Sequence, residues 1–496
     1  MGTSGIVFLS SGLFLGWSLG ANDASNVYGT AVASRMVKFK TAALLCSIFL
    51  MLGALIDGVG TAHTLGALGS VNAIGGAFVT SFAAAFTVFL MTKYGLPVSV
   101  SQAVVGAIIG WNCFTDSITD VSSVVKIAST WIACPVLGGI FGALVFAVFK
   151  QISKHVNLSL LQRDALTRFA MIVTGAFGSY ALGANNMANV VGVFIPVVPF
   201  TEFSFFGIEI SPVHQLFFVG SVAVAIGVYT YSYKVMMTVG KGLLPLSPFA
   251  SWVVVLSQSL VLFIFASEGL EYFLASHNLP TIPLVPVSST QAVVGAVIGI
   301  GIYKGAARNI DWTVFVRIMC GWVITPIITA FICFISLYVM KNLFDQPVYT
   351  PKTYTISEGV LNEFEDHGIS ADKLQVLIGK SFSSGKEMIS AIEDHKELSN
   401  KQELLALKYA EVVRIKIDTK KMNKLSEKIF SNQEKKDLLA LQDREFNYRW
   451  EIEDALIKQN KSWQKKPDTV LNKKFNEEIM QQYKMIEGVF KWEAQG

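Results

Sequence analysis

The chain contains Pro97-Val-Ser-Val-Ser-Gln-Ala-Val-Val-Gly-Ala-Ile-Ile-Gly110 and, later, Pro286-Val-Ser-Ser-Thr-Gln-Ala-Val-Val-Gly-Ala-Val-Ile-Gly299. The two stretches are identical at 11 of 14 positions. A second motif is also duplicated, upstream of the first in each case: Leu19-Gly-Ala-Asn-Asp-Ala-Ser-Asn26 returns as Leu182-Gly-Ala-Asn-Asn-Met-Ala-Asn189. Two motifs repeated in the same order indicate that the chain consists of two related halves.

Both halves are apolar. Of the 496 residues 52% are hydrophobic and 15% charged, with a mean hydropathy of +0.49, which is unusual for a soluble protein. Ten apolar runs approach the length that crosses a bilayer. Since ten runs divide into five per half, an odd number, the halves are predicted to be inverted repeats. The runs cover about 5–20, 41–60, 73–92, 97–113, 124–149, 168–184, 213–233, 245–267, 282–303 and 313–340.

Charge separates the end of the chain from the rest. Residues 1–345 hold 15 basic and 11 acidic residues, whereas residues 346–496 hold 25 of each. We therefore predict an all-α polytopic membrane protein, with a first repeat at 1–155, a second, inverted repeat at 156–345 and a small soluble helical domain at 346–496. Broken helices and helical hairpins are expected within the repeats.

Loop charges predict the orientation in the membrane. Basic residues occur in alternate connections, as at Arg35–Lys40 and Lys150–Arg168, and acidic residues in the others, as at Asp116–Asp120 and Glu268–Glu271. The positive-inside rule makes the basic connections cytoplasmic. The same alternation places the C-terminal domain outside the cell, across a plasma or inner membrane.

The Asn-rich motif predicts a cation site. Polar groups at membrane depth are costly and need a partner or a function. A glycine-led break in the helix would free backbone carbonyls, which together with carboxylate and amide oxygens suit sodium. The alternative is that Asp23 only caps the second half-helix. The candidate cation ligands are Asn22, Asp23, Asn26, Asn185, Asn186 and Asn189; the expected metal is sodium only, with no transition metal.

The Pro-Val-Ser motif predicts an anion site. Ser99 with Gln102, and Ser288 with Gln291, have capping-box spacing at the start of an apolar helix. The free N–H groups and positive dipole end of such a helix attract anions. Two starts related by the repeat could hold one tetrahedral oxyanion, or could simply be well-capped hairpins. The candidate substrate ligands are Ser99, Val100, Ser101, Gln102, Ser288, Ser289, Thr290 and Gln291.

With both motifs present in both halves, residues 5–340 resemble the PiT family of inorganic phosphate transporters. The resemblance implies a symporter in which two inverted halves enclose phosphate and its co-transported cation, working as a homodimer in a lipid bilayer. It assigns the Asn-rich motif to the cation and the Ser-containing motif to the anion. Asp57 resembles an acidic position of the family and is a possible coupling acid.

Two departures from the family affect this expectation. Asn186 stands where the family has Asp in the second copy, and Gln102 and Gln291 stand where it usually has His. The loss of an acid would weaken or delete one cation site. Because protonated phosphate donates a hydrogen bond and sulfate only accepts, fewer acceptors would favour sulfate.

Phosphate symport driven by sodium or protons is therefore the expected function, with a sulfate or related oxyanion permease as the alternative. An anion-sensing receptor, in which the charged domain reports binding, is a further possibility, and a channel is a third. No enzyme is expected, because the segments offer no nucleophile–base pair or metal cluster. Gly379–Lys386 has the wrong spacing for a phosphate-binding loop, so neither ATP nor any other cofactor is expected. No basic tract predicts nucleic-acid binding.

Overall fold

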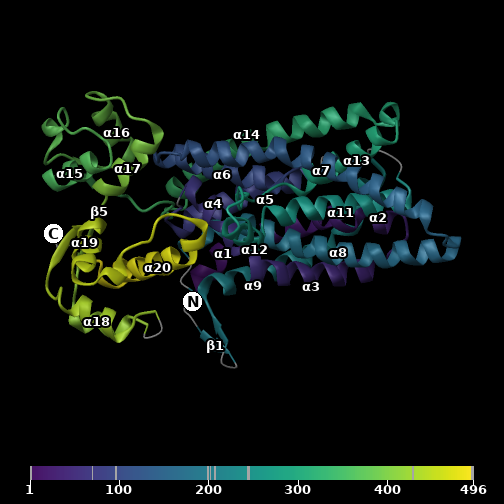
Figure 1. The fold of residues 1–496 in the computed structure, drawn as a ribbon. Helices are drawn as coiled ribbons and strands as arrows, with labels where there is room; N and C mark the ends of the chain where they lie inside the picture. The colour runs from purple at the N-terminus through teal and green to yellow at the C-terminus, as the bar shows by residue number, and fades with distance from the viewer. Residues whose placement is uncertain are drawn as a thin grey trace. The chain divides into compact units, whose positions relative to one another are not determined.

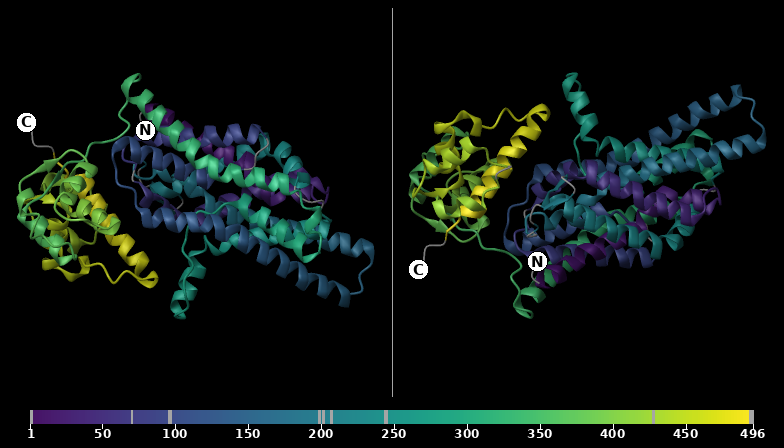
Figure 2. Two further views of the ribbon diagram at one scale, coloured as in Figure 1. Left: turned by 90° about the horizontal axis from the view of Figure 1, so that it is seen from above. Right: turned by 90° about the horizontal axis from the view of Figure 1, so that it is seen from below.

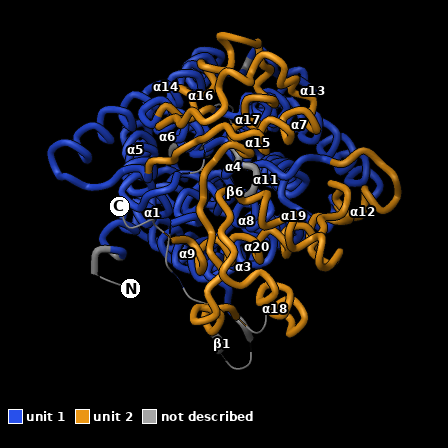
Figure 3. The backbone as a smooth tube through the Cα atoms, turned by 90° about the vertical axis from the view of Figure 1, so that its left-hand side faces the viewer, with its two compact units in different colours: residues 1–115, 119–271, 282–350 blue, residues 116–118, 272–281, 351–496 orange. Residues whose placement is uncertain are grey.

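The computed structural model describes residues 3–492 except 70, 95–97, 198–199, 201–202, 206–207, 243–245 and 427–428. Its contacts divide the chain into two compact units (Figure 3). Unit 1 comprises residues 1–115, 119–271 and 282–350, and unit 2 comprises 116–118, 272–281 and 351–496. The two halves predicted from the repeats thus lie together in one body.

Unit 1 is a bundle whose long helices lie side by side (Figure 1). Its first half contains α1 (Thr3–Asn22), α2 (Ala24–Ala33), α3 (Phe39–Asp57), α4 (Val59–Leu68), α5 (Ile74–Lys93), α6 (Val100–Thr115) and α7 (Val121–His155). Its second half contains α8 (Leu160–Val191), β1 (Phe203–Phe205), β2 (Ile208–Ile210), α9 (Pro212–Thr230), α10 (Ser232–Gly242), α11 (Pro248–Ile264), the first four residues of α12 (Glu268–Ser276), α13 (Ser289–Tyr303) and α14 (Trp312–Asn342). The connection between α7 and α8 lies at one end of the bundle (Figure 2).

Each of the ten apolar runs overlaps a helix, in order α1, α3, α5, α6, α7, α8, α9, α11, α13 and α14. Among the described residues, six helices are long and apolar enough to cross a membrane, or seven spans if the bent pair α11 and α12 counts as one. The helices α6 and α13 have 16 and 15 residues, which is less than the roughly 20 that cross the hydrocarbon core. The helical, polytopic fold class is therefore confirmed, while the inverted orientation of the halves stays a prediction.

The two halves pack on each other through pairs of helices, one helix from each half, which we call exchanged pairs. Helix α6 of the first half packs on α14 of the second, and α13 of the second packs on α7 of the first. In the same way α1 packs on α9, and α3 packs on α8. Each half therefore completes the other, and the largest hydrophobic cluster contains residues of both halves.

Glycines make the exchanged contacts close. A Cβ on Gly106 of α6 would lie 2.2 Å from the carbonyl oxygen of Pro326 in α14. A Cβ on Gly295 of α13 would lie 2.0 Å from the carbonyl oxygen of Pro135 in α7. Since no side chain fits at such distances, both repeated glycines let a helix backbone pass directly over a proline carbonyl.

The prediction of broken helices at the Asn-rich motif is wrong for the second copy. Helix α8 continues through Asn185 and Asn189 to Val191, followed by a single 3-10 turn. In the first copy the interruption between α1 and α2 is one residue, Asp23, whose φ of −80° and ψ of −32° are helical. The polar side chains find partners on neighbouring helices, as described below, so the backbone need not unwind to satisfy them.

Unit 2 is more than the helical domain predicted. Besides its helices it contains two antiparallel two-stranded sheets, β3 with β4 and β5 with β6. Two hydrophobic clusters, one around Phe364 and one around Trp463, form its interior. Its elements are β3 (Tyr354–Thr355), α15 (Glu358–Asp366), β4 (Ser381–Phe382), α16 (Gly385–Glu393), α17 (Asn400–Ala410), β5 (Val412–Lys416), α18 (Asn432–Leu439), β6 (Glu445–Tyr448), α19 (Arg449–Gln459) and α20 (Lys473–Phe490).

Candidate functional site

The starts of α6 and α13 meet inside unit 1. Ser101 Oγ lies 3.5 Å from the carbonyl oxygen of Val287, just before α13. Reciprocally, Thr290 Oγ1 lies 3.4 Å from the carbonyl oxygen of Val98, just before α6. Both contacts are long for hydrogen bonds. Their reciprocity brings the two predicted anion-binding helix starts to one place.

Each start is capped by its predicted serine. Ser99 Oγ accepts from the backbone N–H of Gln102 at 3.4 Å, and Ser288 Oγ accepts from that of Gln291 at 3.3 Å. The capping box itself is not completed, because the buried Oε1 atoms of both glutamines have no hydrogen-bond partner in the described part of the chain. Val100, the first residue of α6, is buried and has no polar side-chain group to offer. Pro97 lies outside the described residues.

The first Asn-rich motif joins α1 and α2 to the start of α13. Asn22 Nδ2 donates to Asp23 Oδ1 at 2.9 Å and to the carbonyl oxygen of Val98 at 3.1 Å. Asn26 Nδ2 donates to Ser289 Oγ and Thr290 Oγ1, both at 3.0 Å. Asp23 forms no side-chain cap on α2, so the capping alternative is not what the structure shows.

The second copy contacts the segment before α13 through Asn185 and the start of α6 through Asn189. Asn185 Oδ1 accepts from the backbone N–H of Val287 at 2.7 Å, and Asn185 Nδ2 donates to the Val285 carbonyl at 3.1 Å. Asn189 Nδ2 donates to Ser101 Oγ at 2.8 Å and to Asn186 Oδ1 at 3.0 Å. Each motif thus bonds the segment before the helix start of its own half and a hydroxyl at the helix start of the other half. The groups predicted as separate cation and anion sites therefore form one network.

The whole network is enclosed: each of its polar side chains is at most 3% exposed. Several of its amide atoms have no hydrogen-bond partner among the described residues, which is costly unless a ligand supplies one. They are the oxygens of Gln102, Asn189, Gln258 and Gln291 and the Nδ2 of Asn186.

Sequence reasoning missed Gln258. This residue of α11 is fully buried, and its Nε2 donates to the carbonyl oxygen of Asn26 at 2.9 Å. It belongs to neither repeated motif. The signal available was a lone amide inside the apolar run 245–267, where an uncompensated polar group is expensive.

Asp57 does not join the network. It ends α3, and its Oδ2 accepts a 2.7 Å hydrogen bond from Tyr180 OH of α8. Since α3 and α8 form one of the exchanged helix pairs, this bond ties the two halves together at a second point. A coupling role for Asp57 stays a prediction.

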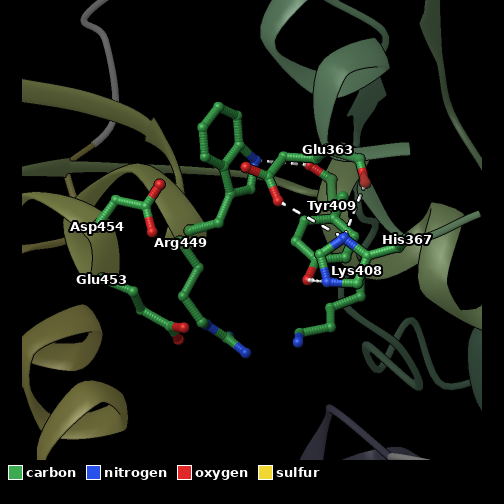
Figure 4. A pocket seen from close by; sticks show the side chains of 8 residues that line it. Glu363, His367, Lys408, Tyr409, Arg449, Glu453 and Asp454 are labelled. Atoms are coloured by element: carbon green, nitrogen blue, oxygen red, sulfur yellow. Dashed lines mark hydrogen bonds and ion pairs between the residues drawn. The ribbon is translucent and has the colours of Figure 1, made fainter. Parts of the chain in front are cut away.

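Unit 2 contains a separate pocket of about 170 Å³ lined by charged and aromatic side chains. Figure 4 shows His367 between Glu363 and Tyr409, whose hydroxyl lies 2.8 Å from His367 Nε2. Burial and the neighbouring Asp454 raise the pKa of Glu363, and burial raises the pKa of Tyr409 to about 12. Within the described ranges, no cluster of three His, Cys, Asp or Glu side chains could hold a metal ion.

Comparison with known proteins places these observations in a family. A model described as "Phosphate transporter family" matches residues 19–333 and, in a second match, 275–435. The first match alone covers more than half of the chain and includes every residue of the network.

Individual relatives agree. A Haemophilus influenzae protein named "Putative phosphate permease" is 26% identical over 420 residues, covering 67% of this chain and 96% of the relative. A Methanocaldococcus jannaschii protein with a similar name is 26% identical over 323 residues, covering 65% and 93%. A solved structure described as "The sodium-dependent phosphate transporter" is 22% identical with a TM-score of 0.53, covering 68% of this chain and 98% of its own. This last likeness shows a shared fold.

Proposed function

The chain belongs to the phosphate transporter family, and from that premise we propose that it carries inorganic phosphate across a membrane together with a cation. Membership makes it an integral membrane transporter rather than an enzyme. What is proposed for this chain is the substrate, the coupling and the residues that perform both.

The main support for this proposal is that the starts of α6 and α13 meet inside the protein. Two helix starts bring N–H groups and positive dipole ends to one enclosed place, where an oxyanion would be stabilised. Ser101, Ser289 and Thr290 contribute hydroxyls there. Ser99 and Ser288 act indirectly: their hydroxyls cap the two helices and so fix the direction of the N–H groups.

The unpartnered oxygens favour phosphate over sulfate. A buried amide oxygen without a donor among the described residues occurs in each of Gln102, Gln291, Asn189 and Gln258. Phosphate at neutral pH keeps at least one proton that can be donated to such an oxygen, whereas sulfate has none. These amide oxygens can therefore accept hydrogen bonds from phosphate, as the family's second Asp, here Asn186, would have done.

Asp23 is the proposed centre of coupling. It is the one carboxylate among the candidate network residues, and it is 2% exposed. A buried charge of this kind must be neutralised when the site is closed to water. Sodium, held with amide oxygens such as that of Asn22, or a proton would do so and would then travel with the anion.

The test is uptake of radiolabelled phosphate and sulfate into proteoliposomes, with sodium and pH gradients imposed separately. Accumulation of phosphate under one of the two gradients supports the proposal and identifies the cation. Accumulation of sulfate instead would assign the oxyanion alternative. If neither anion accumulates under either gradient, coupled transport is refuted.

Three further parts of the proposal concern the assembly. We propose that the protein lies in the plasma or inner membrane, that it forms a homodimer, and that unit 2 is external. Protease access to residues 356–492, or reaction of a cysteine introduced there with an impermeant reagent, from one side of intact cells tests the last point.

A further inference from the structure

The two halves of the network differ by one charge. Alignment of the repeated motifs places Asn186 opposite Asp23. Both lie in the same position of their motif, at most 2% exposed, next to the helix start of the other half. An amide therefore occupies, in the second half, the place that a carboxylate occupies in the first.

The contacts of Asn186 show which of its atoms is available. Its Oδ1 accepts from Asn189 Nδ2 at 3.0 Å and lies 3.5 Å from Ser101 Oγ. Its Nδ2, in contrast, is buried and has no hydrogen-bond partner within the described part of the chain. An amide N–H donates and cannot ligate a cation, so the free group of Asn186 is suited to an anion oxygen.

We propose that Asn186 is a substrate-binding donor, and that each phosphate consequently crosses with the cation bound at Asp23 but without a second cation in the other half. This inference rests on the proposed function and specifies its stoichiometry. In the second half, Asn186 then donates a hydrogen bond directly to the anion, at the place where the first half has Asp23 and its cation.

The decisive variant is Asn186→Asp. A carboxylate at this buried position must be neutralised by a further cation when the site closes. At zero membrane potential, a tenfold gradient of the coupling cation then raises steady-state phosphate accumulation about tenfold over wild type, because each coupled ion adds one such factor to the equilibrium ratio. Equal accumulation by Asn186→Asp and wild type would overturn the inference.

A second variant covers the case in which Asn186→Asp does not fold. Asn186→Ala removes the donor without adding charge. It should raise the KM for phosphate about tenfold, since a hydrogen bond to a charged ligand is lost, while the dependence of uptake on cation concentration stays as in wild type. A changed cation dependence with an unchanged KM for phosphate would assign Asn186 to the cation and reject the inference.

Asn112→Asp is the matched control. Asn112 is also a buried asparagine of unit 1, but its Nδ2 bonds Leu68 and Thr119, away from the network. The control should keep the wild-type accumulation ratio, and a tenfold rise there too would show that added charge acts nonspecifically. Failure of wild type to accumulate phosphate at all would instead refute the proposed function, so the two failures are distinguishable.

Discussion

Asn189 in the second half donates a 2.8 Å hydrogen bond to Ser101 at the first half's helix start. The reciprocal bond, from Asn26 to Thr290, is 3.0 Å long. These bonds connect motifs that are far apart in the sequence, and each bond links the start of a helix in one half to a residue of the other half. A movement of one half would therefore change the geometry of an anion held between both starts.

Ser101→Ala should weaken phosphate binding. The variant removes the acceptor of Asn189 Nδ2 together with a hydroxyl at the start of α6. Loss of one buried hydrogen bond costs about 1–2 kcal/mol, which corresponds to a roughly 5- to 30-fold higher KM for phosphate uptake. The measurement is initial uptake into proteoliposomes at varied phosphate concentration.

Ser221→Ala is its control, because the buried Ser221 hydroxyl bonds the Phe217 carbonyl in its own helix, α9. Its KM should remain near wild type. Equal effects of the two substitutions would mean that Ser101 acts through general packing.

Asn185→Ala should destabilise the segment leading into α13. The substitution leaves the backbone N–H of Val287 and the carbonyl of Val285 without their side-chain partner. An orphaned buried group costs about 1–3 kcal/mol, so the melting temperature in detergent should fall and uptake should decrease.

Asn185→Asp provides the comparison. Its carboxylate can still accept from Val287 N–H but cannot donate to Val285, so some of the connection is kept. If the alanine variant melts at the wild-type temperature, this connection does not stabilise the segment.

Gly106→Ala and Gly295→Ala should both strongly impair folding. Their added Cβ atoms would lie 2.2 and 2.0 Å from the carbonyl oxygens of Pro326 and Pro135, which belong to backbone and cannot move aside. Overpacking of this kind costs about 1–3 kcal/mol or more. The yield of monodisperse protein and its melting temperature measure the effect.

Gly66→Ala serves as the matched helix substitution, since a Cβ there meets nothing within 4 Å. It should be close to neutral. Equal yields from all three variants would show that the helices separate easily, contrary to the exchanged packing.

The repeated motifs predicted that the two helix starts meet. The order of the motifs showed that the chain has two related halves, and the capping pattern showed where a helix begins in each half. The same reasoning failed at residues 183–191, where glycine and amides were interpreted as a helix break. Their side chains instead bond to α6 and to the segment before α13, so tertiary partners replaced the unwinding that the local sequence suggested.

Other features were hidden from the sequence for the same reason. Gln258 belongs to no repeat, and its place beside Asn26 follows only from the packing of α11 against α2. The strands of unit 2 have two to five residues. Such short strands show too little alternation of apolar and polar residues to be distinguished from the helical pattern around them.

Glu363→Gln should stabilise unit 2 at neutral pH and not in acid. Burial and the carboxylates of Asp454 and Asp366 raise the pKa of Glu363, while His367 and Lys408 oppose the rise. A raised pKa in the folded state means that the protonated form is favoured, so its stabilising contribution is present below the unfolded pKa and is lost as pH rises through the folded one. Glutamine resembles the protonated form and keeps the contribution at pH 7.

The gain should remain below about 1 kcal/mol, because solvent screens the partly exposed pocket. Hydrogen exchange of α15 in the full chain, corrected for the intrinsic rate at each pH, measures it. Glu365→Gln, on the same helix but outside the pocket lining, should give no such pH-dependent difference. Slower exchange of Glu363→Gln at pH 7 that vanishes near pH 4 supports the electrostatic cause, whereas a pH-independent change would assign it to packing.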